Sequence, residues 1–223
     1  IENDQMKADA LSFRDRFSSI VFGNPLLTTE EDNQAVVQAV AGEFQDMDQE
    51  TALVLMGHGT EHYANSVYAA LDYRFKDRDI KNFLGTVEAY PALDSLLRAA
   101  DSFQPKKIVL APFMIVAGDH AQNDLAGEDP DSWMNRLSSE GYEVTPVLKG
   151  LGEYPKIRQI LVDHVQQAMD ASIDSKQGIF FISTIKNCTG IHLRIFRCSF
   201  FIFMKLLEIL KISVIYAINS YSL

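Results

Sequence analysis

His58, Glu88 and His120 each lie at or just after the end of an apolar run that has the length of a β-strand. These runs are residues 52–56, 83–87 and 107–116. In a parallel sheet the carboxyl ends of the strands meet at one edge, so we expect the three side chains to converge there. Two imidazoles and one carboxylate would form an open site for Co2+, Fe2+, Ni2+ or Zn2+. The sequence therefore predicts a metal site at the carboxyl edge of a sheet.

Each of these residues also has a purely structural interpretation. A histidine after a strand often hydrogen-bonds the loop backbone, and His120 within Gly-Asp-His is compatible with a turn. Glu88 is compatible with capping a helix that begins near Pro91, because an acidic group interacts favourably with a helix N-terminus. The shared placement of all three after apolar runs is what favours the metal site.

A second chemistry is suggested by His58-Gly-Thr-Glu61-His62, which matches the H-x-x-E-H pattern of inverted zinc proteases. That pattern requires both histidines on one face of a helix. Gly57 and Gly59 flank His58, and two glycines disfavour a helix by about 1 kcal/mol each. We therefore expect a strand end and a loop here, with Glu61 and His62 on the rim of the site.

The elements that must position these residues alternate along the chain. Strands are predicted at residues 18–22, 52–56, 83–87, 107–116 and 142–148. Helices are predicted at residues 30–44, 64–75, 91–100, 132–139 and 154–171. We expect Thr29 to cap the first of these helices, and Pro91 to open the third. This order predicts an α/β fold with a parallel sheet flanked by helices.

Composition excludes some partners. An apolar content of 47% suffices for a full core, and the net charge of -10 argues against nucleic acid or an anionic membrane as partner. Residues 1–172 hold 14 basic against 28 acidic side chains, whereas residues 173–223 hold 6 against 2. The longest uncharged run in this last segment is 12 residues, short of the roughly 20 that a membrane span needs. We interpret residues 173–223 as an atypical hydrophobic tail; a peripheral membrane or oligomer contact is the alternative.

Five ordered segments resemble the anaerobic-pathway sirohydrochlorin cobaltochelatases. They are Leu55-Met-Gly-His-Gly-Thr-Glu-His62, Gly85-Thr-Val-Glu-Ala-Tyr-Pro91, the segment 112–124, and the shorter blocks 129–133 and 150–153. The resemblance covers about residues 1–171. It implies the class II chelatase fold of two similar α/β lobes, of which this chain would hold mainly the C-terminal one.

The resemblance also implies a function. Members of this family are lyases that insert Co2+ into sirohydrochlorin, a reduced tetrapyrrole with eight carboxylates and a precursor of cobalamin, without ATP. The family's metal ligands fall on His58, Glu88 and His120, and we expect a cytoplasmic protein, with homo-oligomers an open possibility. A chelatase for Fe2+ or Ni2+, or a non-catalytic metal-binding remnant, are the alternatives.

The resemblance further suggests how the chain is divided. Residues 1–17 are expected to be the end of an otherwise missing N-terminal lobe, and residues 18–172 the metal-binding lobe. The tail from residue 173 has no recognised counterpart, so the activity of the chain as it stands is an open question. A substrate with many carboxylates also needs cations, for which Arg74, Lys76 and Arg78 are candidates, although a solvated helix end explains them as well.

Overall fold

The computed structural model describes most of the chain up to the end of its last helix. The described residues are 2–17, 19–100, 102–119 and 121–174. The chain divides into two compact units, Leu26–Ile160 and the pair of segments Ile1–Pro25 and Leu161–Leu223, and each is described by itself. The domain bounds expected after residues 17 and 172 remain a prediction. His120 and all of the predicted hydrophobic tail after its first two residues lie outside the described residues.

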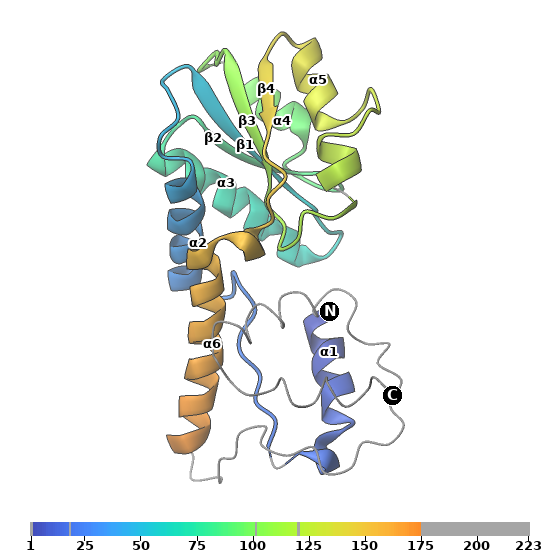
Figure 1. The fold of residues 1–223 in the computed structure, drawn as a ribbon, viewed down its shortest axis with the longest axis vertical. Helices are drawn as coiled ribbons and strands as arrows, with labels where there is room; N and C mark the ends of the chain where they lie inside the picture. Colours follow the sequence, from blue (N-terminus) through green and yellow to red (C-terminus); the bar gives the residue numbers. More distant parts are fainter. Residues whose placement is uncertain (1, 18, 101, 120, 175–223) are drawn as a thin grey trace, which may run out of the picture. The chain divides into compact units, whose positions relative to one another are not determined.

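The larger unit is a parallel sheet with helices on both faces (Figure 1). Its strands, all parallel and in the spatial order β2-β1-β3-β4, are β1 (Thr51–Gly57), β2 (Asn82–Thr86), β3 (Lys107–Pro112) and β4 (Glu143–Pro146). Its helices are α2 (Glu30–Glu43), α3 (Ser66–Arg78), α4 (Leu93–Ala100), α5 (Trp133–Ser139) and the first part of α6 (Pro155–Asp174). Short helical turns are η2 (Tyr63–Asn65), η3 (Ala121–Leu125) and η4 (Leu151–Glu153). The predicted α/β class with a parallel sheet is confirmed.

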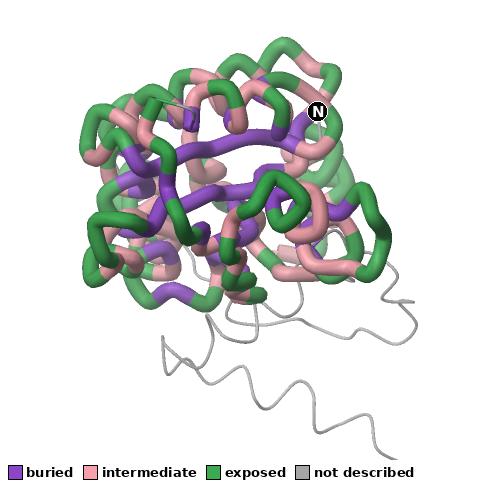
Figure 2. The backbone as a smooth tube through the Cα atoms, turned by 90° about the horizontal axis from the view of Figure 1, so that it is seen from above, coloured by how far each residue is buried: buried purple, intermediate pink, exposed green. Residues whose placement is uncertain are grey.

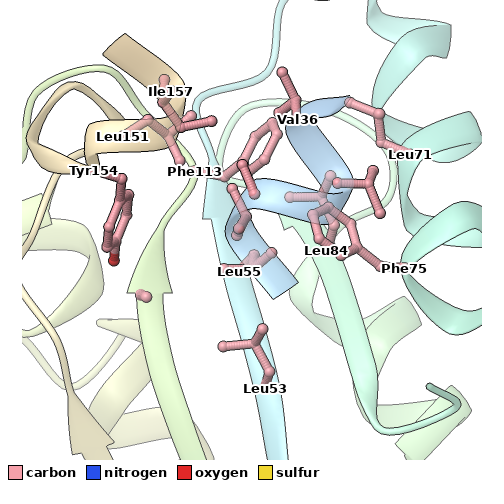
Figure 3. Packing of buried hydrophobic residues seen from close by; sticks show 14 residues of the cluster. Val36, Leu53, Leu55, Leu71, Phe75, Leu84, Phe113, Leu151, Tyr154 and Ile157 are labelled. Carbon is pink, nitrogen blue, oxygen red and sulfur yellow. The ribbon is translucent and has the colours of Figure 1, made fainter. Parts of the chain in front are cut away.

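Strand β1 explains why the sheet needs helices on both sides. All seven of its residues are buried, and alternate side chains point to opposite faces of the sheet. Leu53 and Leu55 pack with α2, α3 and the start of α6 (Figure 3), whereas Val54 and Met56 pack with α4 and α5. Buried stretches run through the middle of the unit, with exposed and half-buried segments around them (Figure 2). A strand buried on both faces reads as a continuous apolar run, which is how the sequence presents it.

Two helices begin after a residue whose side chain caps them, and the first of these caps, Thr29, was predicted. Thr29 accepts a hydrogen bond from the backbone N–H of Asp32 at 3.1 Å, so α2 begins where expected. Ser132 caps α5 in the same way by accepting from the Asn135 N–H at 3.3 Å. The acid-rich segment before α5 thus ends in an ordinary helix cap.

The prediction that Pro91 opens a helix was wrong, because α4 begins at Leu93. The Tyr90–Pro91 peptide is cis. The carbonyl of Pro91 turns back to accept hydrogen bonds from the N–H of Thr86 at 2.6 Å and from its hydroxyl at 3.2 Å. Pro91 therefore closes a tight loop onto the end of β2, and the helix starts only after it.

The strand predicted at residues 107–116 is shorter than expected, since β3 ends at Pro112 rather than at residue 116. The N–H of Phe113 still donates to Met56 at 2.7 Å. Beyond that point the carbonyls of Met114 and Ile115 accept from the N–H groups of Leu151 and Gly152, at 2.7 and 2.9 Å. The apolar run continues, but its backbone is paired with η4 instead of a strand.

The smaller unit contains α1 (Glu2–Leu11), η1 (Arg14–Arg16), the segment up to Pro25 and the second part of α6. The predicted strand at residues 18–22 was wrong: residues 19–22 form no strand. Just after this segment, the Asn24 carbonyl accepts a hydrogen bond from the Nδ1–H of His164 in α6 at 2.8 Å. Within the described part of the chain, no helix is both long and apolar enough to cross a membrane.

Candidate metal site

Two of the three predicted ligands lie side by side at the carboxyl edge of the sheet. Strands β1 and β2 are paired with Gly57 opposite Thr86, and the pairing continues past both strand ends. The Val87 N–H donates to the Gly57 carbonyl and the Glu88 N–H to the His58 carbonyl, each at 3.0 Å. As a result, Nδ1 of His58 lies 3.5 Å from Oε2 of Glu88. The expected convergence therefore holds for His58 and Glu88.

The backbone around His58 determines which ring nitrogen carries the proton. Nδ1 lies 2.9 Å from the carbonyl oxygen of Gly59. A carbonyl can only accept, so Nδ1 donates, and in the neutral ring the lone pair is then on Nε2. This is the arrangement usual for metal-binding histidines, whose second nitrogen donates to a carbonyl or carboxylate. The side chains of His58 and Glu88 are 43% and 51% exposed, so a ligand in solvent can reach both.

Two glycines allow this loop to approach its neighbours. A Cβ on Gly57 would lie 2.4 Å from Cε1 of Tyr68 in α3, so the tyrosine ring packs directly on the end of β1. Gly59 has φ +87° and a Cβ there would lie 3.0 Å from the backbone nitrogen of Ala89, beside Glu88. Burial raises the pKa of Tyr68, partly offset by a hydrogen bond with the Gly59 backbone. The short distance between the two loops thus depends on residues without side chains.

The same geometry bears on the structural alternatives: His58 does hydrogen-bond the loop backbone, through the Gly59 carbonyl, and its metal role stays a prediction. Residues 58–62 are not helical, so His58 and His62 do not share a helix face as the protease pattern requires. His62 instead caps η2, where its Nδ1 accepts from the Ala64 N–H at 3.2 Å. Asp94, not Glu88, is the acidic residue in the first turn of α4.

His120 is the predicted ligand whose position is not described. The chain before it is fixed, since residues 113–115 are bonded to β1 and η4 as above, and the Gln122 N–H donates to the Gly118 carbonyl at 3.0 Å. Ala121, which follows it, is fully buried. Among the described residues there is no cluster of three or more His, Cys, Asp or Glu side chains able to hold a metal. The role of His120 as third ligand remains a prediction.

The candidate cations for substrate carboxylates lie elsewhere. Arg74 is paired with Glu30, and Lys76 with Asp72 at 2.5 Å. All three candidates, including Arg78 at the last position of α3, lie in the second half of that helix, which leads to the start of β2. His58 and Glu88 instead follow the strand ends. We therefore favour the interpretation that these basic side chains belong to a helix end outside the site.

Sequence reasoning missed two residues that shape this edge, Asn65 and Tyr68. Tyr68 packs on Gly57, and Asn65 hydrogen-bonds to Thr60 and Tyr90. Asn65 is next to the start of α3, where an asparagine usually signals a helix cap. The sequence carries no signal for its contact with Tyr90, which is 25 residues away.

A doubly covered parallel sheet with a histidine–carboxylate pair at its carboxyl edge defines an α/β protein built to bind a ligand at that edge. A family model for cobalt chelatase (CbiK) matches residues 1–170. The chain belongs to the cobalt chelatase (CbiK) family, as the resemblance in its sequence implied.

Individual relatives agree with the family. The chain is 35% identical over 173 residues to a sirohydrochlorin cobaltochelatase of Salmonella typhimurium, a match covering 78% of this chain and 66% of that protein. It is 34% identical over 176 residues to the sirohydrochlorin cobaltochelatase CbiKC of Nitratidesulfovibrio vulgaris, covering 78% and 62%. The matches thus span less than two thirds of the length of either relative.

A solved structure is also similar in part. It is a protein of Marinobacter aquaeolei VT8 with a provisional description as a cobalamin (vitamin B12) biosynthesis CbiX protein. The similarity covers 55% of this chain and 98% of that one, at 18% identity and a TM-score of 0.46.

Proposed function

We propose that this chain carries the metal-binding part of a sirohydrochlorin cobaltochelatase, and that His58, Glu88 and His120 hold Co2+ before it enters the tetrapyrrole. The observation that carries the proposal is that the side chains of His58 and Glu88 lie next to each other at the ligand-binding edge of the sheet in a member of the cobalt chelatase family. A lone pair on Nε2 and a carboxylate are both suitable donors to Co2+.

Metal insertion replaces two pyrrole protons of the macrocycle with the dication. The reaction therefore releases two protons for each Co2+ that enters. Nε2 of His58 becomes free when the metal leaves it, so this nitrogen can accept one of those protons. The Nδ1–H bond to the Gly59 carbonyl keeps the ring in the orientation that presents Nε2. None of these steps consumes ATP.

The proposal also covers which metal is inserted, where the protein acts and what it binds. Fe2+ and Ni2+ bind the same donor types, so the preference for Co2+ must be measured. We infer a cytoplasmic protein that acts on a free tetrapyrrole and binds neither nucleic acid nor membrane, and homo-oligomers are compatible with this role.

Titration of the full chain with Co2+ alone tests the ligands. His58→Ala, Glu88→Gln and His120→Ala should each weaken Co2+ binding by about 100-fold or more, because loss of even an outer-sphere partner costs roughly 10–100-fold. His62→Ala is the matched control, since it removes a nearby imidazole whose Nδ1 caps η2, and it should bind Co2+ as the wild type does. Wild-type affinity in the His58 and Glu88 variants would refute the assignment.

The reaction itself is tested with sirohydrochlorin and Co2+, Ni2+ or Fe2+, followed by the absorbance spectrum of the macrocycle. Faster spectral change with Co2+ than with the other two metals supports a cobaltochelatase. A faster spectral change with Fe2+ or Ni2+ would show that Co2+ is not the preferred substrate metal. A chain that binds Co2+ yet leaves all three rates at the uncatalysed value is a metal-binding remnant.

A further inference from the structure

Asn65 connects the two loops that carry His58 and Glu88. We call residues 58–62 the His58 loop and residues 87–92 the Glu88 loop. The side-chain oxygen of Asn65 accepts from the N–H of Thr60 at 3.0 Å. Its side-chain nitrogen donates to the carbonyl of Tyr90 at 2.7 Å. One amide group therefore bridges two segments that are far apart in the sequence.

The residue type fits this bridge. Thr60 offers a donor and Tyr90 an acceptor, so the connecting side chain needs one acceptor and one donor on the same short group. Among side chains of this length only asparagine has both, since aspartate lacks the donor and leucine has neither. Asn65 stands at the N-cap position of α3 but makes no capping hydrogen bond with its side chain. Its hydrogen bonds are thus directed to the loops.

The bridge completes a frame around the site. On one side, the Glu88 N–H donates to the His58 carbonyl at 3.0 Å. On the other side, Asn65 joins positions two residues beyond each of these, Thr60 and Tyr90. Between the two connections, Gly59 lies against Ala89. Two separate connections fix both the distance and the angle between the loops, whereas one would leave the loops free to splay.

We propose that Asn65 is a positioning residue of the metal site, which holds the His58 and Glu88 loops together so that both side chains meet one ion. The part of this inference that concerns metal rests on the proposed function. The part that concerns the loops stands on the two hydrogen bonds alone.

The test uses the full chain with Asn65→Ala, which removes both bonds, and Asn65→Asp, which keeps the acceptor for Thr60 but cannot donate to Tyr90. Asn135→Ala is the matched control, because the Asn135 amide also donates to two loop carbonyls, those of Gly127 and Asp129, at 3.2 and 2.8 Å. Amide hydrogen exchange of the two loops is measured without metal, and Co2+ affinity is measured by titration.

We expect Asn65→Ala to accelerate exchange at the amides of Thr60 and Glu88 by several-fold and to weaken Co2+ binding roughly tenfold. Asn65→Asp should leave the Thr60 amide protected but still weaken Co2+ binding. Asn135→Ala should change neither loop and not alter Co2+ affinity.

The outcomes separate this inference from the proposed function. Unchanged amide exchange in both loops of Asn65→Ala overturns the inference, whatever the Co2+ affinity of that variant. Faster exchange with an unchanged Co2+ affinity also overturns it, because the bridge would then be structural only. If the wild-type chain binds no Co2+ while exchange rises as expected, the metal site fails and the loop-bridging role of Asn65 is supported.

Discussion

A methyl group added at Gly57 tests whether Tyr68 sets the position of the His58 loop. In Gly57→Ala the new Cβ would lie 2.4 Å from Cε1 and 3.0 Å from Cδ1 of Tyr68. Carbon atoms pack at about 3.5–4.0 Å, so the ring must retreat by roughly 1 Å. Overpacking of this kind costs about 1–3 kcal/mol. A displaced ring also loses its hydrogen bond with the Gly59 backbone, worth about 1 kcal/mol.

The expected total is about 2–4 kcal/mol of unfolding free energy, which urea denaturation measures. Trp133 is the single tryptophan and is buried on the face of the sheet opposite Tyr68. Its fluorescence therefore reports unfolding, and its side chain is not part of the packing that the mutation changes. Co2+ titration of the same variant should show weaker binding, because His58 directly follows the displaced residue.

The double variant Gly57→Ala/Tyr68→Ala separates the clash from other effects. With the ring removed there is nothing for the new methyl group to meet. The double variant should therefore lose less stability than the two single variants together, by about 1–3 kcal/mol. Full additivity, or a Gly57→Ala protein as stable as the wild type, would refute the reasoning.

Two further variants test other contacts within the larger unit. Gly59→Ala should lower the unfolding free energy by about 1–2 kcal/mol and weaken Co2+ binding, since an L-residue at φ +87° is strained and its Cβ would press on Ala89; a variant of wild-type stability in urea would argue against it. Burial, with the nearby charges of Glu43 and Glu153, raises the pKa of Tyr154 to about 12. Because the folded-state pKa lies above the unfolded value of about 10, this contribution is fully present below pH 10 and is lost as the pH rises toward 12. Between pH 10 and pH 12 the unfolding free energy of Tyr154→Phe should therefore fall by roughly 2 kcal/mol less than that of the wild type. Equal dependence of the unfolding free energy on pH in the two proteins would contradict the assignment.

Local patterns were sufficient for most of the helices and strands. The apolar run at residues 52–56 and the capping signal at Thr29 depend only on neighbours in the sequence, and both predictions were confirmed. The wrong predictions share a cause. The segment 19–22 and the end of β3 are both apolar, but residues 19–22 form no strand, and the carbonyls of Met114 and Ile115 bond to η4 instead of a strand. Pro91 suits a helix start locally, yet its carbonyl is taken by Thr86.

The sequence by itself determined the fold class and the residue types at the strand ends, because hydrophobic periodicity and side-chain chemistry are local properties. The resemblance of five ordered segments indicated the family. The sequence also selected His58 and Glu88 correctly as neighbours, since parallel pairing places consecutive strand ends at one edge. Only the tertiary structure decided that Nδ1 of His58 donates to the Gly59 carbonyl and that Asn65 joins the two loops. A hydrogen bond between residues 25 positions apart depends on how the strands pair and where the helix begins, and no local pattern contains that information.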